Sequence, residues 1–269
     1  MKFQLKALAA ALALVAAVPA LAATDSAAAG NSSLILAVYD RTANISALFD
    51  LGKNYSDFSI AGVSFANSGI DAQGQNISWN LAGGDYATAW STYLTTATVA
   101  NSVFAVVAQD NTGNGAGNRG LISTYSAFAT NPVTSQLGTI AGNFDSYQLG
   151  NGLSTNVTYE NHSVVANGGS VSSAGSSYAP NYFGSDKNFN LGPIAAGAVG
   201  SDLGVFQYIS GATTTTRLSP IIFANQAKFN LAANGNLVYS TLPVPEADTW
   251  AMMLLGLGFM GFVARRKQA

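Results

Sequence analysis

The sequence predicts a mainly β domain, arranged as an antiparallel β-sandwich or jelly roll with one or two short helices, followed by a C-terminal transmembrane helix. Short apolar runs bounded by Gly, Asn, Asp and Ser recur along the chain, which is typical of strands joined by turns. Only two stretches have the apolar period of a helix. An apolar run near the C-terminus ends in basic residues. Together these observations indicate a β-sandwich that precedes a membrane segment.

Residues 1–22 are predicted to form a signal peptide that is removed on export. Lys2 and Lys6 make a basic flank, and the apolar run Ala7–Val18 follows. That run is about 12 residues long, which is too short for a membrane span of roughly 20. Ala20 and Ala22 place small side chains just before a cut after Ala22, as a signal peptidase requires. The alternative is an N-terminal anchor that stays uncleaved.

The exported domain is predicted to span residues 23–241 and to be weakly acidic. Charged residues make up only 9% of the whole chain. Between residues 23 and 244 there are six basic and eleven acidic side chains, so the net charge is near −5. No basic stripe is present to neutralise phosphates, and the sequence therefore predicts no nucleic-acid partner. The chain has no cysteine, which excludes disulfides and thiolate metal sites.

Ten apolar runs are predicted to be strands. The last two form the clearest hairpin, because Phe229 and Leu231 alternate with polar neighbours and Asn234-Gly235 supplies the turn. The ten runs are Leu34–Tyr39, Ile45–Leu51, Phe58–Phe65, Ile77–Leu81, Val103–Ala108, Leu121–Phe128, Val205–Ile209, Ile221–Ala224, Lys228–Leu231 and Leu237–Ser240.

A first helix is expected between Tyr86 and Ala97, where apolar side chains recur every three or four residues. Asp85 precedes this run and is a residue type that caps helices. The aromatic residues of the run are expected to lie in the core.

A second helix is expected between Val133 and Tyr147, which show the same apolar period. Asn131 suits the N-cap and Pro132 suits the first helical position. Gly150 suits the stop.

Two loops are expected at the surface, Asp110–Gly120 and Asn167–Pro180, because both are rich in Gly, Ser and Asn. Residues 242–245 contain two prolines and predict an extended tether between the domain and the tail.

The C-terminal tail, residues 242–269, is predicted to contain a transmembrane helix over residues 250–264. These residues are uncharged, and as a helix they would be roughly 22 Å long, which is short for a hydrocarbon core of about 30 Å. The basic residues Arg265, Arg266 and Lys267 follow and are expected to stop transfer and to stay in the cytoplasm. The domain is then expected outside and the C-terminus inside.

The tail resembles the PEP-CTERM sorting signal of Gram-negative bacteria. The resemblance rests on Val244, Pro245 and Glu246 as the motif, the short apolar helix, and the basic cluster at the extreme C-terminus. Ala247 stands where the second Pro of that motif is usual. The resemblance implies an exosortase as processing partner and an association with exopolysaccharide and biofilm. The alternative is an ordinary C-terminal anchor.

A weak calcium motif lies in the first of the two loops. Asp110, Thr112 and Asn114 carry oxygen atoms at alternate positions, and Gly115 follows. In an EF-hand the twelfth position carries Glu, but here it is Leu121. The sequence therefore predicts no EF-hand, keeps these three residues as weak calcium candidates against a solvated turn, and predicts no other cofactor.

Few side chains are suited to catalysis. His162 is the only histidine, so a nucleophilic triad or a multi-histidine zinc site has little to build on. A surface histidine is the simpler interpretation. The eleven acidic residues leave open a pair of carboxylates of the kind that glycosidases use. The sequence as a whole predicts that the protein is not an enzyme.

We therefore expect a non-catalytic protein of the cell surface or extracellular matrix, which passes through the inner membrane in transit. The first alternative is a polysaccharide-binding module or adhesin, in which aromatic rings stack on sugars. A matrix-processing hydrolase is the second alternative. The aromatic candidates for sugar binding are Trp79, Tyr125, Tyr178 and Tyr182, for which packing in the core or anchoring of a loop is an equal alternative.

Overall fold

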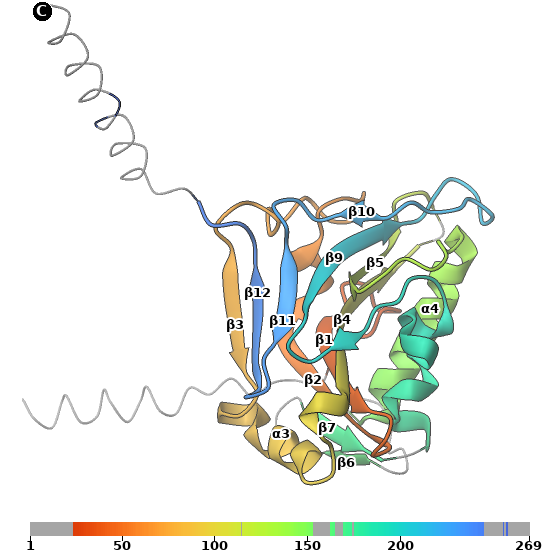
Figure 1. Ribbon diagram of the computed structural model, residues 1–269. Coiled ribbons are helices and arrows are strands. Elements are labelled where there is room, and N and C mark those ends of the chain that lie inside the picture. Colours follow the sequence, from red (N-terminus) through yellow and green to blue (C-terminus); the bar gives the residue numbers. More distant parts are fainter. Residues whose placement is uncertain are drawn as a thin grey trace, which may run out of the picture.

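The computed structural model describes residues 24–113, 115–152, 162–164, 169–173 and 175–244, together with Leu255 and Leu257 (Figure 1). Of residues 162–164 and of Ser176 it describes the backbone alone. The predicted signal peptide lies outside these ranges, and so does the predicted transmembrane helix apart from the two leucines. Among the described residues, no helix combines the length and the apolar character that a membrane span requires.

Twelve strands run through the described part of the chain. They are β1 (Ser33–Asp40), β2 (Ile45–Asn54), β3 (Asn76–Asn80), β4 (Ser102–Asn111), β5 (Arg119–Tyr125), β6 (His162–Val164), β7 (Gly169–Ser172), β8 (Gly197–Ala198), β9 (Asp202–Ile209), β10 (Ile221–Ile222), β11 (Lys228–Leu231) and β12 (Asn236–Ser240).

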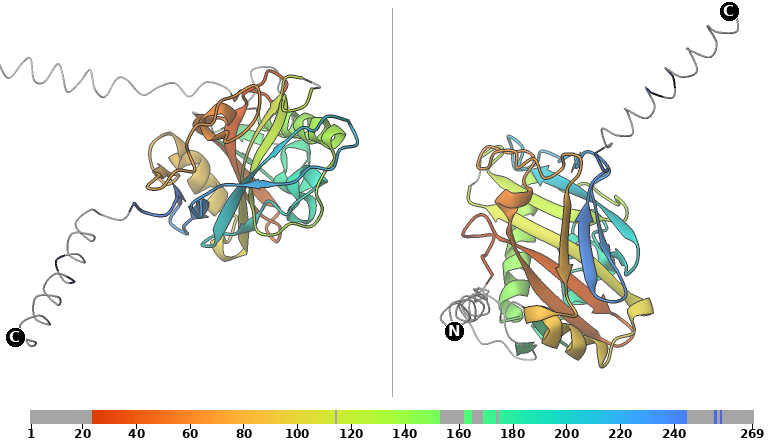
Figure 2. Two further views of the ribbon diagram at one scale, coloured as in Figure 1. Left: turned by 90° about the horizontal axis from the view of Figure 1, so that it is seen from above. Right: turned by 90° about the vertical axis from the view of Figure 1, so that its left-hand side faces the viewer.

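The strands form one antiparallel sheet in the order β3-β12-β11-β9-β5-β4-β1-β2-β7-β6, with β10 paired to β9 and β8 paired to β4. The predicted antiparallel β domain is therefore confirmed. The strands do not separate into the two sheets of the predicted sandwich, because hydrogen bonding between neighbours continues along the whole path. The sheet curls instead, as the view from above in Figure 2 shows.

The central strand β1 is buried over its full length. A continuous apolar run of this kind is typical of a strand that is covered on both faces. Alternate side chains of β1 enter two separate cores. Leu34, Leu36 and Val38 point to the first core, and Ile35, Ala37 and Tyr39 point to the second.

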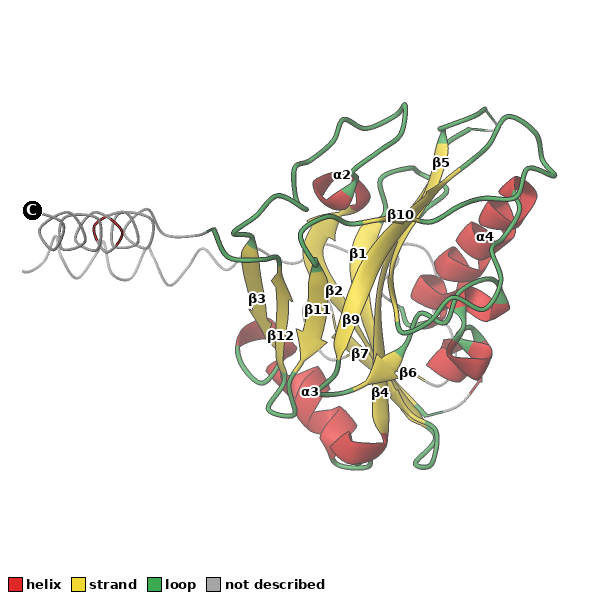
Figure 3. Cartoon of the chain, turned by 45° about the horizontal axis from the view of Figure 1, so that its top comes forward, coloured by secondary structure: helices red, strands yellow, loops and turns green. Residues whose placement is uncertain are grey.

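Each core has its own cover. The first core is enclosed by the curled sheet itself, with α2 (Tyr55–Phe58) and α3 (Ala87–Leu94) closing its ends. The second core is covered by α4 (Thr134–Gly150) and by the segment between residues 175 and 196. Figure 3 shows α4 on one side of the sheet and β3 and β12 on the other. Short 3-10 turns complete the fold at Gly84–Tyr86, Val99–Asn101, Gly175–Ser177, Ala179–Asn181, Gly184–Asp186 and Asn188–Asn190.

A side-chain seam holds the curl closed where β3 approaches β2. The indole Nε1 of Trp79 in β3 donates a hydrogen bond to the carbonyl oxygen of Leu51 in β2 at 2.8 Å. The Tyr86 hydroxyl donates to the neighbouring carbonyl of Asp50. The Trp79 ring also stacks on Phe229 of β11, with 6.1 Å between ring centroids. The seam satisfies backbone oxygens of β2 beyond the residues that pair with β7.

Most predicted strands are confirmed, and the hairpin of β11 and β12 has the expected register. Phe229 lies opposite Tyr239, and Leu231 lies opposite Leu237. Gly235 has a φ of +85° in the turn, a conformation that glycine adopts without strain. Two predicted strands are shorter than expected, since β5 ends at Tyr125 and β10 ends at Ile222.

The first predicted helix is confirmed as α3, although its start differs from the prediction. A 3-10 turn over Gly84–Tyr86 comes first, so Tyr86 and not Asp85 occupies the N-cap position. Trp90 and Tyr93 of α3 lie in the core, as expected for its aromatic residues.

The second predicted helix is confirmed as α4, and here too the cap is a correction. The side chain of Gln136 accepts a hydrogen bond from the Val133 amide at 2.8 Å, and Val133 is the N-cap. Asn131 is not the cap, because its side-chain oxygen accepts a hydrogen bond from the Tyr208 hydroxyl at 2.7 Å.

The predicted strand Phe58–Phe65 is wrong. Phe58 ends α2, and the residues after it form no strand. The buried Gln207 of β9 accepts hydrogen bonds from the amides of Ile60 and Ala61 at 2.9 and 3.0 Å, and it donates to the Ala61 carbonyl at 2.9 Å. A side chain thus satisfies the backbone groups that strand pairing would have used.

The predicted surface loop Asn167–Pro180 is wrong in its described middle. Residues Gly169–Ser172 form β7, which pairs with β2 and is buried throughout. The small Ser and Gly side chains that suggested a loop fit here because α3 packs closely. A Cβ at Gly169 would lie 2.7 Å from the Cβ of Ala89.

We expect two glycine substitutions to shift stability in opposite directions. Gly142→Ala in α4 meets no atom within 4 Å, so we expect the free energy of unfolding to rise by about 1 kcal/mol from helix propensity. Gly120→Ala places a Cβ 1.8 Å from the hydroxyl oxygen of the buried Tyr55, so we expect a loss of about 1–3 kcal/mol from overpacking. Urea unfolding of both variants measures the difference, and equal effects would contradict the packing described around Tyr55.

Candidate functional site at the C-terminal exit

The domain holds its C-terminal segment through backbone hydrogen bonds as far as Leu242. After β12, the Thr241 amide donates to the Gln75 carbonyl at 3.1 Å. The Leu242 amide donates to the Asn225 carbonyl at 2.8 Å, and the Leu242 carbonyl accepts from the Gly74 amide at 2.8 Å. The chain therefore leaves the domain from a fixed point at one end of the sheet, the end at which β10 lies (Figures 1 and 2).

Two loops supply these partners, residues 71–75 and 224–226, and we call them together the exit clamp. Asp71 joins them, because its carboxylate accepts from the Ala224 amide at 3.1 Å and its carbonyl accepts from the Asn225 side chain at 2.8 Å. The Thr241 hydroxyl donates to the Ala72 carbonyl at 2.7 Å. The clamp is thus cross-linked by side chains on both sides of the exit.

Val244 is the last described residue before the tail, and its side chain is 58% exposed. Its Cγ2 atom lies 2.8 Å from the position that a Cβ on Gly74 would occupy. The other predicted sorting residues Pro245, Glu246, Arg265, Arg266 and Lys267 lie outside the described residues, so their roles stay predictions.

The predicted calcium loop is internally bonded where the structure describes it. Asp110 is buried at the end of β4, and its Oδ1 accepts from the Thr112 amide at 3.1 Å and from the Thr112 hydroxyl at 2.8 Å. Asn114 lies outside the described residues. Among the described residues no group of three or more His, Cys, Asp or Glu side chains comes together. Calcium binding stays a prediction.

Nine aspartates in the described part of the chain act as hydrogen-bond acceptors for the domain's own groups. Asp40, for example, accepts hydrogen bonds from the amides of Thr42 and Thr98 at 2.8 and 2.9 Å. It thereby joins the turn after β1 to the loop that follows α3. The aspartates that accept such bonds are Asp25, Asp40, Asp50, Asp57, Asp71, Asp110, Asp145, Asp186 and Asp202.

The acidic residues most strongly affected by burial are Asp50 and Asp145. Burial raises the pKa of the Asp50 carboxyl, hydrogen bonds from Gly52 and Ser33 lower it, and the nearby Asp25 raises it. Burial also raises the pKa of Asp145, while the amides of Ala27 and Ala28 lower it. Both carboxylates are bonded to backbone amides and serve the fold.

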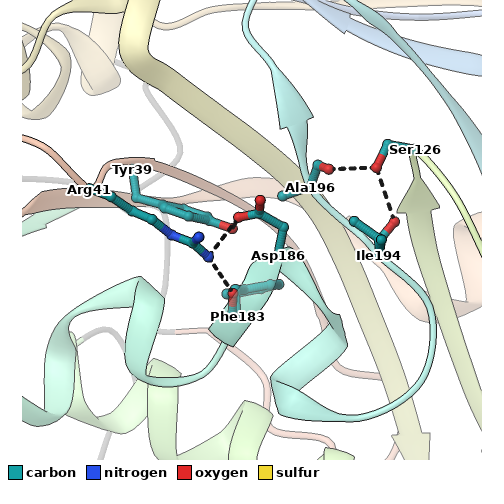
Figure 4. Close-up of polar contacts among 7 residues, drawn as sticks. All are labelled: Tyr39, Arg41, Ser126, Phe183, Asp186, Ile194 and Ala196. Carbon is teal, nitrogen blue, oxygen red and sulfur yellow. Dashed lines mark hydrogen bonds and ion pairs between the residues drawn. The ribbon is translucent and has the colours of Figure 1, made fainter. Parts of the chain in front are cut away.

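Figure 4 shows a polar cluster that the sequence analysis missed. Asp186 accepts a hydrogen bond from the Tyr39 hydroxyl at 2.8 Å and forms an ion pair with Arg41 at 2.8 Å. Burial and the Asp186 carboxylate raise the pKa of Tyr39, so this hydroxyl stays protonated as the donor. Asp186 has a φ of +61°. The cluster fastens the cover of the second core to β1, and no sequence signal relates Asp186 to residues so distant in the chain.

The four aromatic candidates for sugar binding have different surroundings. Trp79 is buried in the seam described above, so it takes the core role and not that of a sugar platform. Tyr178 and Tyr182 are half-buried beside the cover of the second core. Tyr125 packs on Phe128 with 4.5 Å between ring centroids, and the Phe128 side chain is 38% exposed. Tyr125 is half-buried like Tyr178 and Tyr182, and it differs from them in packing on an exposed aromatic neighbour.

Comparison with protein families gives one match. Residues 243–267 match the model of the PEP-CTERM protein-sorting motif. The family that the sequence suggested is therefore confirmed for the tail. The motif implies an exosortase as processing partner and implies export with membrane transit. No curated protein and no solved structure matches the chain.

We expect Asp71→Ala to loosen the exit clamp. The substitution removes the acceptor of the Ala224 amide, and a lost hydrogen bond of about 1 kcal/mol would speed exchange of the Leu242 amide roughly fivefold. Hydrogen–deuterium exchange measures this rate. Asp71→Asn keeps an acceptor oxygen and is the control, and an unchanged Leu242 rate in the alanine variant would contradict the role of Asp71.

We expect Asp50→Asn to change how stability depends on pH. Because the folded pKa of Asp50 is raised, the folded state binds its proton more tightly than the unfolded state. That contribution is present at low pH and is lost as pH rises above the ordinary aspartate pKa of about 3.9. The free energy of unfolding of the Asn variant, measured in urea from acid to neutral pH, should therefore rise relative to that of the native chain.

Asp202→Asn is the control with the opposite sign, because the hydrogen bond from Lys228 lowers the pKa of Asp202. The native chain should therefore gain stability relative to the Asp202→Asn variant as pH rises. A difference between native chain and Asp50→Asn that stays constant with pH would show that Asp50 is not perturbed.

Proposed function

We propose that this chain, whose C-terminal tail is a PEP-CTERM protein-sorting motif, is a non-catalytic exported protein that an exosortase processes and that then resides at the cell surface or in the extracellular matrix. The observation that carries the proposal is the position of the motif. It begins at residue 243, directly after Leu242, the last of the described residues whose backbone is hydrogen-bonded to the clamp. The motif therefore starts where the hydrogen-bonded domain ends.

The use of the carboxylates supports a non-catalytic role. A hydrolase of the glycosidase type needs two carboxyl groups that are free to exchange protons with a substrate. Nine aspartates of the described residues instead accept hydrogen bonds from amides, hydroxyls or basic side chains of the domain. Binding or structural roles fit this arrangement better.

The composition supports an association with exopolysaccharide. Only 9% of the residues are charged, so the surface presents chiefly hydroxyl, amide and backbone groups. Such groups exchange hydrogen bonds with sugar hydroxyls and do not repel a matrix of either charge. The PEP-CTERM resemblance implies the same association.

We expect processing to depend on the motif residues. In the host cell, intact-mass analysis of the mature protein should show a chain that has lost residues 250–269. Replacing both Pro245 and Glu246 by Ala should leave the full tail in place. Ala247→Pro restores the usual second proline and is the matched control, which should be processed at least as well as the native chain. A native chain found only with its full tail in the inner membrane would overturn the proposal.

A second candidate function is polysaccharide binding through the Tyr125–Phe128 pair, favoured by the exposure of the Phe128 side chain. An aromatic face stacked on a sugar ring would be lost on truncation. We expect Phe128→Ala and Phe128→Leu both to reduce retention on immobilised exopolysaccharide of the host strain. If the leucine variant binds as the native chain does, the contact is merely apolar, and if both variants bind normally this second function fails.

A further inference from the structure

The described residues include five exposed aliphatic side chains that serve neither core. They lie in three segments that are distant in the sequence. They are Val63 (76% exposed), Val244 (58%), Ile222 (46%), Ile221 (39%) and Leu242 (37%).

Contacts between loops bring the first of these segments together. The Val63 amide donates to the Gly117 carbonyl at 3.2 Å, so the loop after α2 lies against the loop between β4 and β5. Gln207 binds the Ile60 amide at 2.9 Å and lies opposite Ile221 in the pairing of β9 with β10. Val63 and the two isoleucines therefore belong to one end of the sheet.

The exit clamp joins the remaining two residues to the same end. Ile222 leads directly into the clamp loop 224–226, whose Asn225 binds the Leu242 amide. Val244 lies against Gly74 of the other clamp loop. In Figures 1 and 2 the loop after α2, β10 and the end of β12 all lie at the end of the domain where the chain leaves. We call this surface the exit end.

The exit end carries few charges. Its loops comprise residues 60–75, 112–118, 211–227 and 242–244, and the charged residues among them are Asp71 and Arg217. The Asp71 carboxylate accepts a hydrogen bond from the Ala224 amide. Removing an ion from water is costly, whereas neutral polar and aliphatic groups approach a less polar environment at little cost. Binding of a surface to the headgroup region grows with the apolar area that it buries there, so exposed aliphatic residues favour such a contact.

The sequence of the tail indicates what the exit end faces before the tail is cut. Five residues, 245–249, separate Val244 from the apolar run that starts at Trp250. Fully extended they span about 18 Å. While the tail is intact, the exit end is therefore tied within that distance of the bilayer in which residues 250–264 are proposed to lie.

We propose that the exit end is a membrane-facing surface, on which Val63, Ile221, Ile222, Leu242 and Val244 contact the phospholipid headgroup region until the tail is cut. The inference rests on the proposed function, since it requires the unprocessed chain to be anchored. Because the short tether keeps the exit end close to lipid, even a weak apolar contact with the bilayer is expected to form. Once the tether is cleaved, the same contact is too weak to keep the domain at the membrane.

The test uses the absence of cysteine in the native chain. Ile222→Cys is labelled with an environment-sensitive fluorophore, and the unprocessed chain is reconstituted in phosphatidylethanolamine–phosphatidylglycerol vesicles that carry a nitroxide on the lipid headgroup. Leu94→Cys is the matched control, because Leu94 is 36% exposed at the end of α3 and distant from the exit end. We expect a blue shift and nitroxide quenching at position 222 and neither at position 94. Val63→Cys replaces Ile222→Cys if the latter does not fold.

Each other outcome overturns the inference in a recognisable way. If the chain floats with the vesicles and quenching is equal at positions 222 and 94, the domain is anchored but its exit end does not face the membrane. A blue shift at position 222 that grows with protein concentration without lipid shows that a second copy covers the surface. If the chain does not float with the vesicles, it is not anchored in them, and the membrane transit in the proposed function fails as well. Failure of motif-dependent processing, by contrast, leaves the fluorescence result unchanged.

Discussion

The fold depends on covering a sheet whose central strands are apolar on both faces. β1 presents alternate side chains to two cores, so a single layer on one side would leave a row of apolar groups in water. The protein meets this requirement asymmetrically. One face is covered by α4 and the irregular segment before β8, and the other by the far end of the same sheet curled back. The hydrogen bond from the Trp79 indole to Leu51 closes that curl, since it satisfies a backbone oxygen that lies beyond the pairing of β2 with β7.

Polar side chains that are buried, as Gln207 is, or half-buried, as Asp186 is, determine the irregular segments. Gln207 uses both ends of its amide on the chain after α2, and Asp186 joins Tyr39 and Arg41 beneath the cover of the second core. Each replaces the backbone pairing that a regular strand would supply. Such groups are expensive to bury without partners, so they fix one conformation of the segments that they bind. Two parts of the surface, the exit end and the region around Asp186, are held in this way.

The boundary between the domain and the tail is also set by hydrogen bonds to partners distant in sequence. The exit clamp holds the chain until Leu242 with backbone hydrogen bonds that side chains of Asp71 and Thr241 reinforce, and the sorting motif begins at the next residue. The folded domain therefore ends where the sorting motif begins. The exposed aliphatic residues of the exit end fit the membrane transit that the motif implies.

The sequence by itself determined the elements that depend on local pattern: most strands, both helices, the hairpin turn at Gly235 and the sorting tail, whose motif, apolar run and basic cluster are read along the chain. The tertiary structure decided what depends on partners distant in sequence. Sandwich and curled sheet have the same alternating strands, and they differ in whether hydrogen bonding continues from each strand to the next, as it does here along the whole path from β3 to β6. The strand expected at Phe58–Phe65 became a loop because Gln207, far along the chain, takes its hydrogen bonds. The serines and glycines of β7 suggested a loop, because no local pattern reveals the close approach of α3 that requires small side chains.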